Sequence, residues 1–326
     1  MMVLCFSMLL CDNGFSSFVP VYSQGQNINS SSFSSSQSSS PSSSFQSKAA
    51  MINNIPSQKV TVGDIEIAYK QLGNSNAKPI ILITGNGATM DTWSPLLLEQ
   101  LTSSNYSVII FDNRGMGNTT AGTKQFSISQ FAKDTAGLLD ALKIAKADVL
   151  GWSLGSYIAQ ELTLTYPDKV SNLILYASGC GGQDATPTSP KIIQIVTNAS
   201  LSMQERIEKQ IPFLFPTKWF KANPDYLNYL SIPKESISAQ IIRQQLEAVA
   251  NWTGTCNTIS NITQPTLVIV GTEDAPLQDA LMLARKIPGS WLVQIRDAGH
   301  GLMYQYPSEF NRVIITFLEN SHEHKG

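Results

Sequence analysis

From Lys59 onward, short uninterrupted apolar runs alternate with longer segments whose apolar residues have helical spacing. Runs such as Ile80-Ile81-Leu82-Ile83 are typical of strands buried on both faces, as in a parallel sheet that helices cover. The runs predict eight strands, at residues 60–63, 66–72, 80–84, 108–112, 148–151, 170–177, 266–271 and 292–296. Gly63-Asp64, between the first two strands, is a hairpin signal.

Helical patterns lie between most of these strands. They cover residues 128–142, 154–166, 277–287 and 307–319. This alternation predicts an α/β fold in which helices flank a mostly parallel sheet of eight strands. The chain has 326 residues, which is long enough for one such domain. We place that domain at residues 58–321, with a short tail at residues 322–326.

One stretch interrupts the alternation, because residues 181–261 contain several helical patterns and no strand-like run. Ser202-Met203-Gln204-Glu205 is a capping box, which marks the start of a helix, and residues 241–252 form another helical pattern. Aromatic residues are frequent in this stretch: Phe213, Phe215, Trp219, Phe220, Tyr226, Tyr229 and Trp252. We interpret the insertion, at about residues 182–260, as a helical cap over one end of the sheet.

The N-terminal region has a different composition. Residues 1–10 are an apolar run that matches the central part of a signal peptide and is too short to cross a bilayer. Val21-Tyr22-Ser23 fits a cleavage site, so a signal peptide is predicted at residues 1–23, although no basic residue precedes Lys48.

A serine tract follows the apolar run. Serine makes up 13 of the 18 residues from Ser30 to Ser47, and such a tract cannot bury enough apolar surface to fold. Residues 24–57 are therefore expected to be a disordered linker. The N-terminal region as a whole predicts a secreted or cell-surface protein with weak membrane association through the N-terminus, or a cytoplasmic protein if the run is not a signal.

Charge and composition exclude several functions. Lys and Arg number 22 and Asp and Glu 24, so the chain lacks the basic excess that is typical of nucleic-acid binding. The histidines are His300, His322 and His324, which leaves few metal ligands. Cys180 and Cys256 have no metal-type spacing. We expect two buried free thiols, with a disulfide as the alternative in an exported protein.

Gly151-Trp152-Ser153-Leu154-Gly155 lies between a predicted strand and a predicted helix. This is the G-x-S-x-G nucleophile elbow in the context that the motif requires. The tight turn needs small residues on both sides of the serine, and Gly151 and Gly155 supply them. The alternative is that Ser153 is an ordinary helix N-cap.

A serine hydroxyl becomes a good nucleophile when a base removes its proton. His300 is the candidate base, because it follows the last predicted strand, whereas the other two histidines lie near the end of the chain. The carboxylate that orients it is expected to be Asp274, with Glu273 as the alternative, since both follow the strand at residues 266–271. The chain order Ser153, Asp274, His300 is that of the α/β-hydrolases.

An ester-cleaving serine also needs two N–H donors for the oxyanion. One is expected from the backbone of Leu154, at the start of a helix. The other is expected from Asn86, in the loop Thr84-Gly85-Asn86-Gly87 that follows a predicted strand. The alternative is that this loop is a plain glycine turn.

The segment at residues 112–119 combines glycines with charged residues, but it matches neither a Walker A nor a dinucleotide fingerprint. We interpret it as a structural turn in which Arg114 donates hydrogen bonds to nearby carbonyl groups.

Taken together, residues 59–321 resemble α/β-hydrolases of the esterase and lipase type that have a short helical cap. The resemblance lies in the elbow, the D-x-R-G-x-G-x-[ST] turn at residues 112–119, the G-x-x-D loop at residues 271–274 and the G-H-G segment at residues 299–301. It implies the nucleophile Ser153, the acid Asp274, the base His300 and the oxyanion donors Asn86 and Leu154. The chain departs from the family at Thr84-Gly85, where His-Gly is usual, and at Ser156, where a third glycine is common.

The function predicted from these residues is hydrolysis of carboxylic esters through an acyl-enzyme, with no metal or organic cofactor. Aromatic residues near the nucleophile and in the cap suggest a small apolar ester as substrate. The candidate pocket residues are Trp93, Trp152, Phe213, Phe215 and Trp219.

Four alternatives remain open at this point. The same triad serves proline-iminopeptidase-like peptidases, cofactor-free haloperoxidases or perhydrolases, and carbon–carbon bond hydrolases. A peptidase would need cap acids to hold a substrate ammonium, and the candidates are Glu205, Glu208 and Asp225. The fourth alternative is a non-catalytic ligand-binding protein on the same fold.

Overall fold

The structure is a computed structural model that describes residues 45, 47–50, 52, 54–183, 185–231, 235 and 237–323. The predicted signal peptide at residues 1–23 and the first part of the predicted linker lie outside the described residues. So do His324 and the other residues at the C-terminal end of the predicted tail. Every element below belongs to one unit, at residues 35–326.

Eight strands form a single sheet in the order β1-β2-β4-β3-β5-β6-β7-β8. The strands are β1 (Gln58–Val62), β2 (Ile65–Leu72), β3 (Lys78–Ile83), β4 (Tyr106–Phe111), β5 (Ala147–Trp152), β6 (Val170–Tyr176), β7 (Thr266–Gly271) and β8 (Trp291–Ile295). β1 pairs antiparallel with β2, and β2 pairs antiparallel with β4. All other pairs are parallel. The mostly parallel eight-stranded sheet predicted from the sequence is therefore confirmed.

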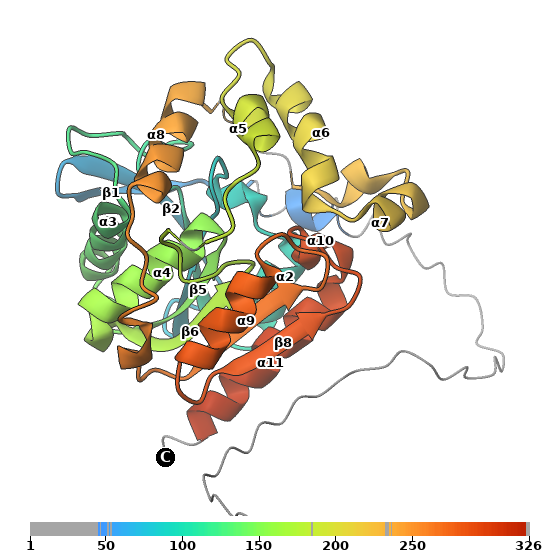
Figure 1. Ribbon diagram of the computed structural model, residues 1–326. Coiled ribbons are helices and arrows are strands. Elements are labelled where there is room, and N and C mark those ends of the chain that lie inside the picture. The colour runs from blue at the N-terminus through green and yellow to red at the C-terminus, as the bar shows by residue number, and fades with distance from the viewer. Residues whose placement is uncertain are drawn as a thin grey trace, which may run out of the picture. The chain divides into compact units, whose positions relative to one another are not determined.

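Helices cover both faces of the sheet, as Figure 1 shows. Because side chains alternate along a strand, each uninterrupted run supplies apolar residues to both faces. In β3, Ile81 and Ile83 pack in one core cluster, whereas Ile80 and Leu82 pack in the other. The first cluster includes residues of α3 (Ile128–Ala141), α4 (Leu154–Thr165) and α9 (Leu277–Lys286). The second includes residues of α2 (Pro95–Ser103) and α11 (Pro307–Glu323).

Local signals explain where the helices begin. Ser127 caps α3 by accepting a hydrogen bond from the N–H of Gln130 at 3.0 Å. The predicted capping box is present, since Ser202 and Glu205 each accept from the other's backbone N–H. Helix α2 was not predicted. It is short and begins with Pro95, a residue that suits the first helical position.

The cap lies between β6 and β7 and gathers at one end of the molecule (Figure 1). Its elements are α5 (Pro190–Val196), α6 (Met203–Leu214), α7 (Thr217–Ala222), the 3₁₀ turn η3 (Tyr226–Tyr229) and α8 (Ala239–Ala250). Cys180 and Cys256, at the two ends of this insertion, form a disulfide with a Cα–Cα distance of 5.1 Å. The expectation of two free thiols is therefore wrong. The reason is local, because the N–H of Thr255 donates to the carbonyl of Cys180 at 2.8 Å and brings the two segments together.

The turn after β4 has the structural role that the sequence predicts. Arg114 is buried and donates to both carboxylate oxygens of Asp134 at 2.8 Å. It also binds Asp64, at 2.9 and 3.0 Å, and the carbonyl of Ala121. Its main partners are thus two carboxylates rather than carbonyl groups, as a buried guanidinium requires for charge compensation.

The packed part of the chain begins earlier than residue 58. Phe45 is only 4% exposed and belongs to the core cluster that includes α2 and α11. Ala49 and Ile52 pack against the same cluster, and the ammonium of Lys70 donates to the carbonyl of Ile52 at 3.3 Å. The expectation that the disordered linker extends to residue 57 is therefore wrong. The serine-rich composition concealed an apolar residue, Phe45, that fills a site on the core.

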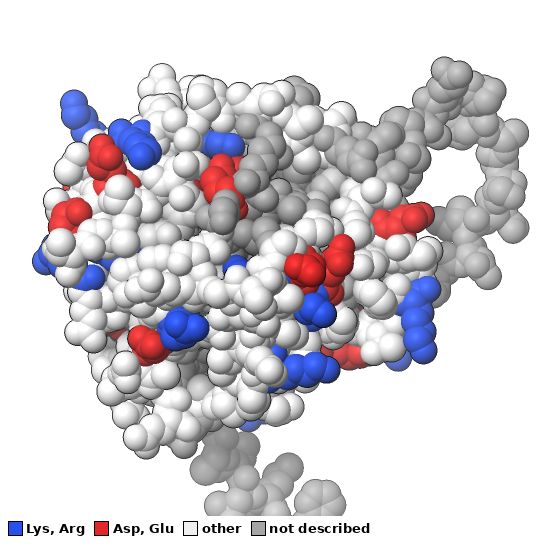
Figure 2. Space-filling view, turned by 90° about the horizontal axis from the view of Figure 1, so that it is seen from above, with Lys and Arg blue, Asp and Glu red and all other residues white. Residues whose placement is uncertain are grey.

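Charged residues are sparse on the face seen from above in Figure 2, where Lys and Arg lie close to Asp and Glu in small groups. Among the described residues, no helix is both long enough and apolar enough to span a bilayer.

We expect Phe45→Ala to lower the free energy of unfolding by about 3 kcal/mol, because truncation of a buried phenylalanine removes apolar burial and leaves a cavity. Removal of residues 1–52 should cost at least as much. Urea unfolding measures both effects, and Ile193→Ala is the matched control because Ile193 is 38% exposed. Equal stabilities of the Phe45→Ala and Ile193→Ala proteins would contradict this packing.

We expect loss of the disulfide to destabilise the protein. The bridge closes a loop with a sequence separation of 76, for which chain entropy predicts a stabilisation of about 4 kcal/mol. The Cys180→Ser/Cys256→Ser protein should therefore unfold at a lower urea concentration than the oxidised wild type. A reducing agent should bring the wild type to the level of the double variant and leave that variant unchanged. An unchanged midpoint in both comparisons would show that the bridge adds no stability.

Candidate active site

Ser153 occupies the turn between β5 and α4. Its φ of 54° and ψ of −116° are values that non-glycine residues rarely adopt and that are typical of strained functional positions. The strand side of the turn is fixed by the N–H of Ser153, which donates to the carbonyl of Tyr176 at 2.9 Å. The hydroxyl of Ser153 makes no capping bond to α4. The alternative role as an ordinary N-cap is therefore wrong.

The turn is possible because two neighbours lack side chains. A Cβ atom on Gly155 would overlap the carbonyl oxygen of Ile83, and one on Gly151 would overlap the carbonyl of Gly155. Ser156, where a third glycine is common, is also accommodated. Its hydroxyl donates to the carbonyl of Gly151 at 2.6 Å and accepts from the N–H of Tyr176 at 3.1 Å. It therefore ties the first turn of α4 to the ends of β5 and β6.

His300 and Asp274 are brought together by the loops after β8 and β7. Nδ1 of His300 lies 2.9 Å from Oδ1 and 3.2 Å from Oδ2 of Asp274. Asp274 is buried, whereas Glu273 is exposed. The structure thus pairs Asp274, and not Glu273, with the histidine. Ser153 lies at the end of β5 in the same parallel sheet, so all three residues follow carboxyl ends of parallel strands.

The electrostatics of the pair favour a charged imidazole. Burial of the imidazole favours its neutral form and lowers the pKa of His300. The negative charge of Asp274 and the hydrogen bond that Asp274 accepts favour the charged form and outweigh the effect of burial. The pKa of His300 is therefore raised above its ordinary value. Because Nδ1 faces the carboxylate, Nε2 is the ring nitrogen left for a second partner.

Tyr176 is a supporting residue that the sequence analysis missed. Its hydroxyl donates to the carbonyl of His300 at 2.6 Å, and its backbone carbonyl is the acceptor for Ser153. Its ring stacks on Trp152 with centroids 6.0 Å apart. One buried residue therefore connects the backbones of the two candidate catalytic groups. No motif marks it, because the contact with His300 spans 124 positions.

The loop after β3 contains Asn86, and α4 begins at Leu154. The N–H of Leu154 belongs to the first turn of the helix, where backbone donors have no intrahelical acceptor. In the loop, the hydroxyl of Thr84 donates to the carbonyl of Ala88 at 3.3 Å and accepts from the side chain of Asn113. A buried threonine thus supports the loop at the position where the family usually has histidine. Gly85 lies directly beside Ser153, because a Cβ atom added there would be 3.3 Å from that of the serine.

Three of the five candidate pocket residues, Trp93, Trp152 and Phe215, belong to one core cluster, and partly buried Trp219 packs against it. The rings of Trp93 and Trp152 are 6.2 Å apart, and Trp152 is 6.0 Å from the ring of His300. Phe213 is not part of this cluster. Its ring lies 5.7 Å from the ammonium of Lys191 in α5.

The end of α6 is attached to the histidine loop. The N–H of Gly301 donates to the carbonyl of Leu214 at 2.8 Å. The ring of Phe215 lies so close to Gly301 that a Cβ atom there would overlap it, and this ring stacks on Trp219 at 4.6 Å. The cap therefore contacts the segment that contains His300 through both its backbone and its aromatic side chains.

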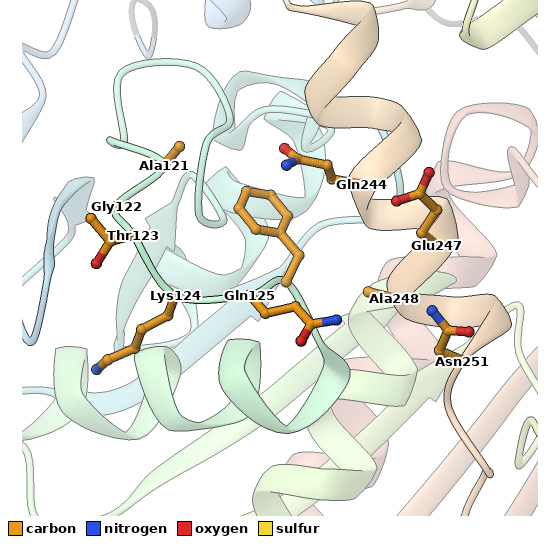
Figure 3. Close-up of a pocket in the computed structure, with 10 residues that line it drawn as sticks. Ala121, Gly122, Thr123, Lys124, Gln125, Gln244, Glu247, Ala248 and Asn251 are labelled. Carbon is orange, nitrogen blue, oxygen red and sulfur yellow. The ribbon is translucent and has the colours of Figure 1, made fainter.

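A concave region lies away from these residues. Figure 3 shows this pocket. It has a volume of about 260 Å³ and is lined by residues 121–126, by Gln244, Glu247 and Ala248 of α8, and by Asn251, which follows that helix. None of Ser153, Asp274 and His300 lines it. In the part of the chain that the structure describes, no group of three or more His, Cys, Asp or Glu side chains could hold a metal ion.

Known proteins resemble this chain over most of its length. The family model described as alpha/beta hydrolase fold matches residues 78–219. The putative non-heme bromoperoxidase BpoC of Mycobacterium tuberculosis is 30% identical over 262 residues, which cover 78% of this chain and 98% of that protein.

Solved structures show the same likeness. An alpha/beta hydrolase fold protein from Chitinophaga pinensis is 29% identical to this chain, with a TM-score of 0.70. The match covers 81% of this chain and 98% of that protein's chain. A thermophilic esterase from Thermogutta terrifontis has a TM-score of 0.69 and 25% identity, covering 82% of this chain and 99% of its own.

We expect the imidazole of His300 to titrate with a pKa above its ordinary value, and Asp274→Asn to lower that pKa. The reason is that the substitution removes the negative charge, so burial alone then favours the neutral ring. An NMR pH titration of the histidine ring protons measures the change, and Glu273→Gln is the control because that side chain is exposed. A pKa that stayed the same or rose in Asp274→Asn would contradict the pairing.

Proposed function

This chain belongs to the α/β-hydrolase family, and from that membership we propose that it is a serine hydrolase that cleaves carboxylic esters through an acyl-enzyme. The observation that supports the proposal most directly is the pairing of His300 with buried Asp274 at the sheet edge that also holds strained Ser153. A nucleophile, a base and an orienting carboxylate at one edge are the parts that acyl transfer requires. The name of the thermophilic esterase from Thermogutta terrifontis, which is 25% identical to this chain, also supports ester cleavage.

In the proposed reaction Oγ of Ser153 attacks the ester carbonyl while Nε2 of His300 takes its proton. The new C–O bond gives a tetrahedral intermediate whose oxyanion accepts from the N–H groups of Asn86 and Leu154. The bond to the alcohol then breaks, and His300 gives the proton to the departing alkoxide. Water cleaves the acyl-enzyme by the same route, and Asp274 stabilises the imidazolium in both halves.

The protonation state of His300 sets the pH dependence of this reaction. Only the neutral imidazole can accept the proton of Ser153. Because Asp274 raises the pKa of His300, activity should rise with pH through an ionisation that lies above the ordinary value of histidine.

The substrate proposed is a small apolar ester. Buried Trp152 directly precedes the nucleophile, and its ring lies 6.2 Å from that of buried Trp93. Phe215 of the cap lies against Gly301. Aromatic walls of this kind suit an acyl or aryl group that leaves water on binding.

Two of the alternative activities can be compared with the structure and the relatives. A proline-iminopeptidase would need acids that hold an ammonium, but Glu205, Glu208 and Asp225 are all exposed, and Glu205 is engaged in its capping box. Haloperoxidase activity is favoured by the name of BpoC, the relative at 30% identity. Ester hydrolysis remains the first proposal because it needs no co-substrate other than water.

We also propose that the protein is exported. The support comes from the signal-like run at residues 1–10 and from the disulfide between Cys180 and Cys256, since such bonds persist in oxidising compartments.

We expect Ser153→Ala and His300→Ala each to lower kcat for p-nitrophenyl esters by a factor on the order of 10⁶, because nucleophile and base act as one unit. Asp274→Asn should cost about 10⁴, since the imidazole loses its orientation. Circular dichroism should show that all three variants fold.

A panel of substrates distinguishes ester hydrolysis from the alternative activities. Turnover of p-nitrophenyl esters from acetate to palmitate is compared with turnover of proline p-nitroanilide and with bromination in the presence of hydrogen peroxide. A fluorophosphonate probe should label the wild type and not Ser153→Ala. Ester turnover retained by Ser153→Ala would end the proposed mechanism, whereas a wild type that neither reacts with the probe nor turns over any substrate would point to a binding protein.

A further inference from the structure

Gln245 connects the cap to the loop that contains Asn86. It lies in the middle of α8, the last helix of the cap, and its side chain is 0% exposed. Its side-chain oxygen accepts from the N–H of Gly87 at 3.0 Å and from the side-chain amide of Asn86 at 3.2 Å. The same amide of Asn86 reaches the carbonyl of Ile242, one turn earlier in α8, at 3.5 Å. Three contacts from one helix therefore converge on two successive loop residues.

These contacts fix which way the amide of Gln245 points. The backbone N–H of Gly87 is a donor only, so the group that faces it must be the oxygen of Gln245 and not its NH₂. The NH₂ group then points elsewhere, and it is buried without a hydrogen-bond partner among the described residues. An amide buried in this way costs free energy that an apolar side chain of similar size would not. Stability alone does not explain a glutamine here.

The geometry of the loop does explain it. Asn86 lies between Gly85, which is beside Ser153, and Gly87, which has a φ of 68° in the left-handed region. A glycine in that region has a flexible backbone unless its neighbours hold it. The oxygen of Gln245 binds both the side chain of Asn86 and the peptide N–H that follows Asn86. It therefore holds Asn86 on its side-chain side and on its C-terminal side, which restrains the residue whose own N–H, in the preceding peptide, is the proposed oxyanion donor.

We propose that Gln245 is a positioning residue for the oxyanion hole, through which the cap helix α8 holds the backbone N–H of Asn86 in the orientation that the transition state needs. This inference rests on the proposed serine-hydrolase function. It assigns to the cap a part in the chemical step in addition to its part in binding substrate.

The test compares the same substitution at two neighbouring positions of α8. Gln245→Met keeps the size of the side chain and removes the carbonyl acceptor. Gln244→Met is the matched control, because Gln244 lines the pocket of Figure 3 on a different face of the helix. Gln245→Asn is a second variant that loses the contact, because its side chain is one methylene shorter and its carbonyl does not reach the loop.

The readouts are kcat and KM for a p-nitrophenyl ester and the inhibition constant of a boronic acid, which forms a tetrahedral adduct with an active serine. We expect Gln245→Met and Gln245→Asn to lower kcat by about 10- to 100-fold with KM within about twofold, which is less than the roughly 10²- to 10³-fold cost of removing an oxyanion donor itself. The affinity for the boronic acid should fall by the same factor. Gln244→Met should match the wild type.

Two outcomes would overturn the inference: boronic-acid affinity within about twofold of wild type in both loss variants, or a loss confined to KM or to thermal stability. Ser153→Ala separates this failure from that of the proposed function. If Ser153→Ala is inactive and the Gln245 variants behave as wild type, only the role of Gln245 is wrong. If Ser153→Ala still hydrolyses the ester, the proposed mechanism itself fails.

Discussion

The close approach of helix α4 to the ends of β3 and β5 is the constraint on which the site depends. Without side chains at Gly151 and Gly155, the helix can begin directly at Leu154, and Ser153 is held in a conformation that alanine or serine rarely adopts. This approach also brings Gly85 next to Ser153. The loop after β3 therefore lies close to the position at which the proposed tetrahedral intermediate would form on the serine. Any side chain at either glycine would separate the two halves of the proposed site.

The cap is attached to the catalytic edge at more than one point. Leu214 at the end of α6 accepts from Gly301, and Gln245 of α8 accepts from Gly87. The disulfide between Cys180 and Cys256 joins the two ends of the insertion. Because backbone groups next to the candidate base and the candidate oxyanion donor both bind cap residues, a displacement of the cap would change the geometry of the site. The cap is in this sense part of the framework that holds the site.

Some of this structure follows from local sequence, and some does not. The uninterrupted run in β3 predicts a strand buried on both faces, because the alternation of side chains is a property of the strand itself. Ser153 is found from a pentapeptide for the same reason, since the elbow is a local turn. The supporting contacts are of a different kind. Gln245 and Gly87 are 158 positions apart, and Tyr176 and His300 are 124 apart, so no spacing rule marks them. Phe45 was concealed by the serines around it.

The distribution of unpaired polar groups connects stability with function. In the described part of the chain, buried side-chain atoms without a hydrogen-bond partner are frequent in the segment after the β3 loop and around the elbow: Thr89, Thr92, Trp93, Ser94, Trp152 and Gln245. Each such atom lowers stability, because its bond with water is lost on folding and not replaced. The backbone of the same region is firmly bonded, as the contacts of Ser153, Gly87 and Gly301 show. Stability is therefore given up close to the residues whose positions the proposed reaction requires, which is the pattern expected where function and not packing determines the local sequence.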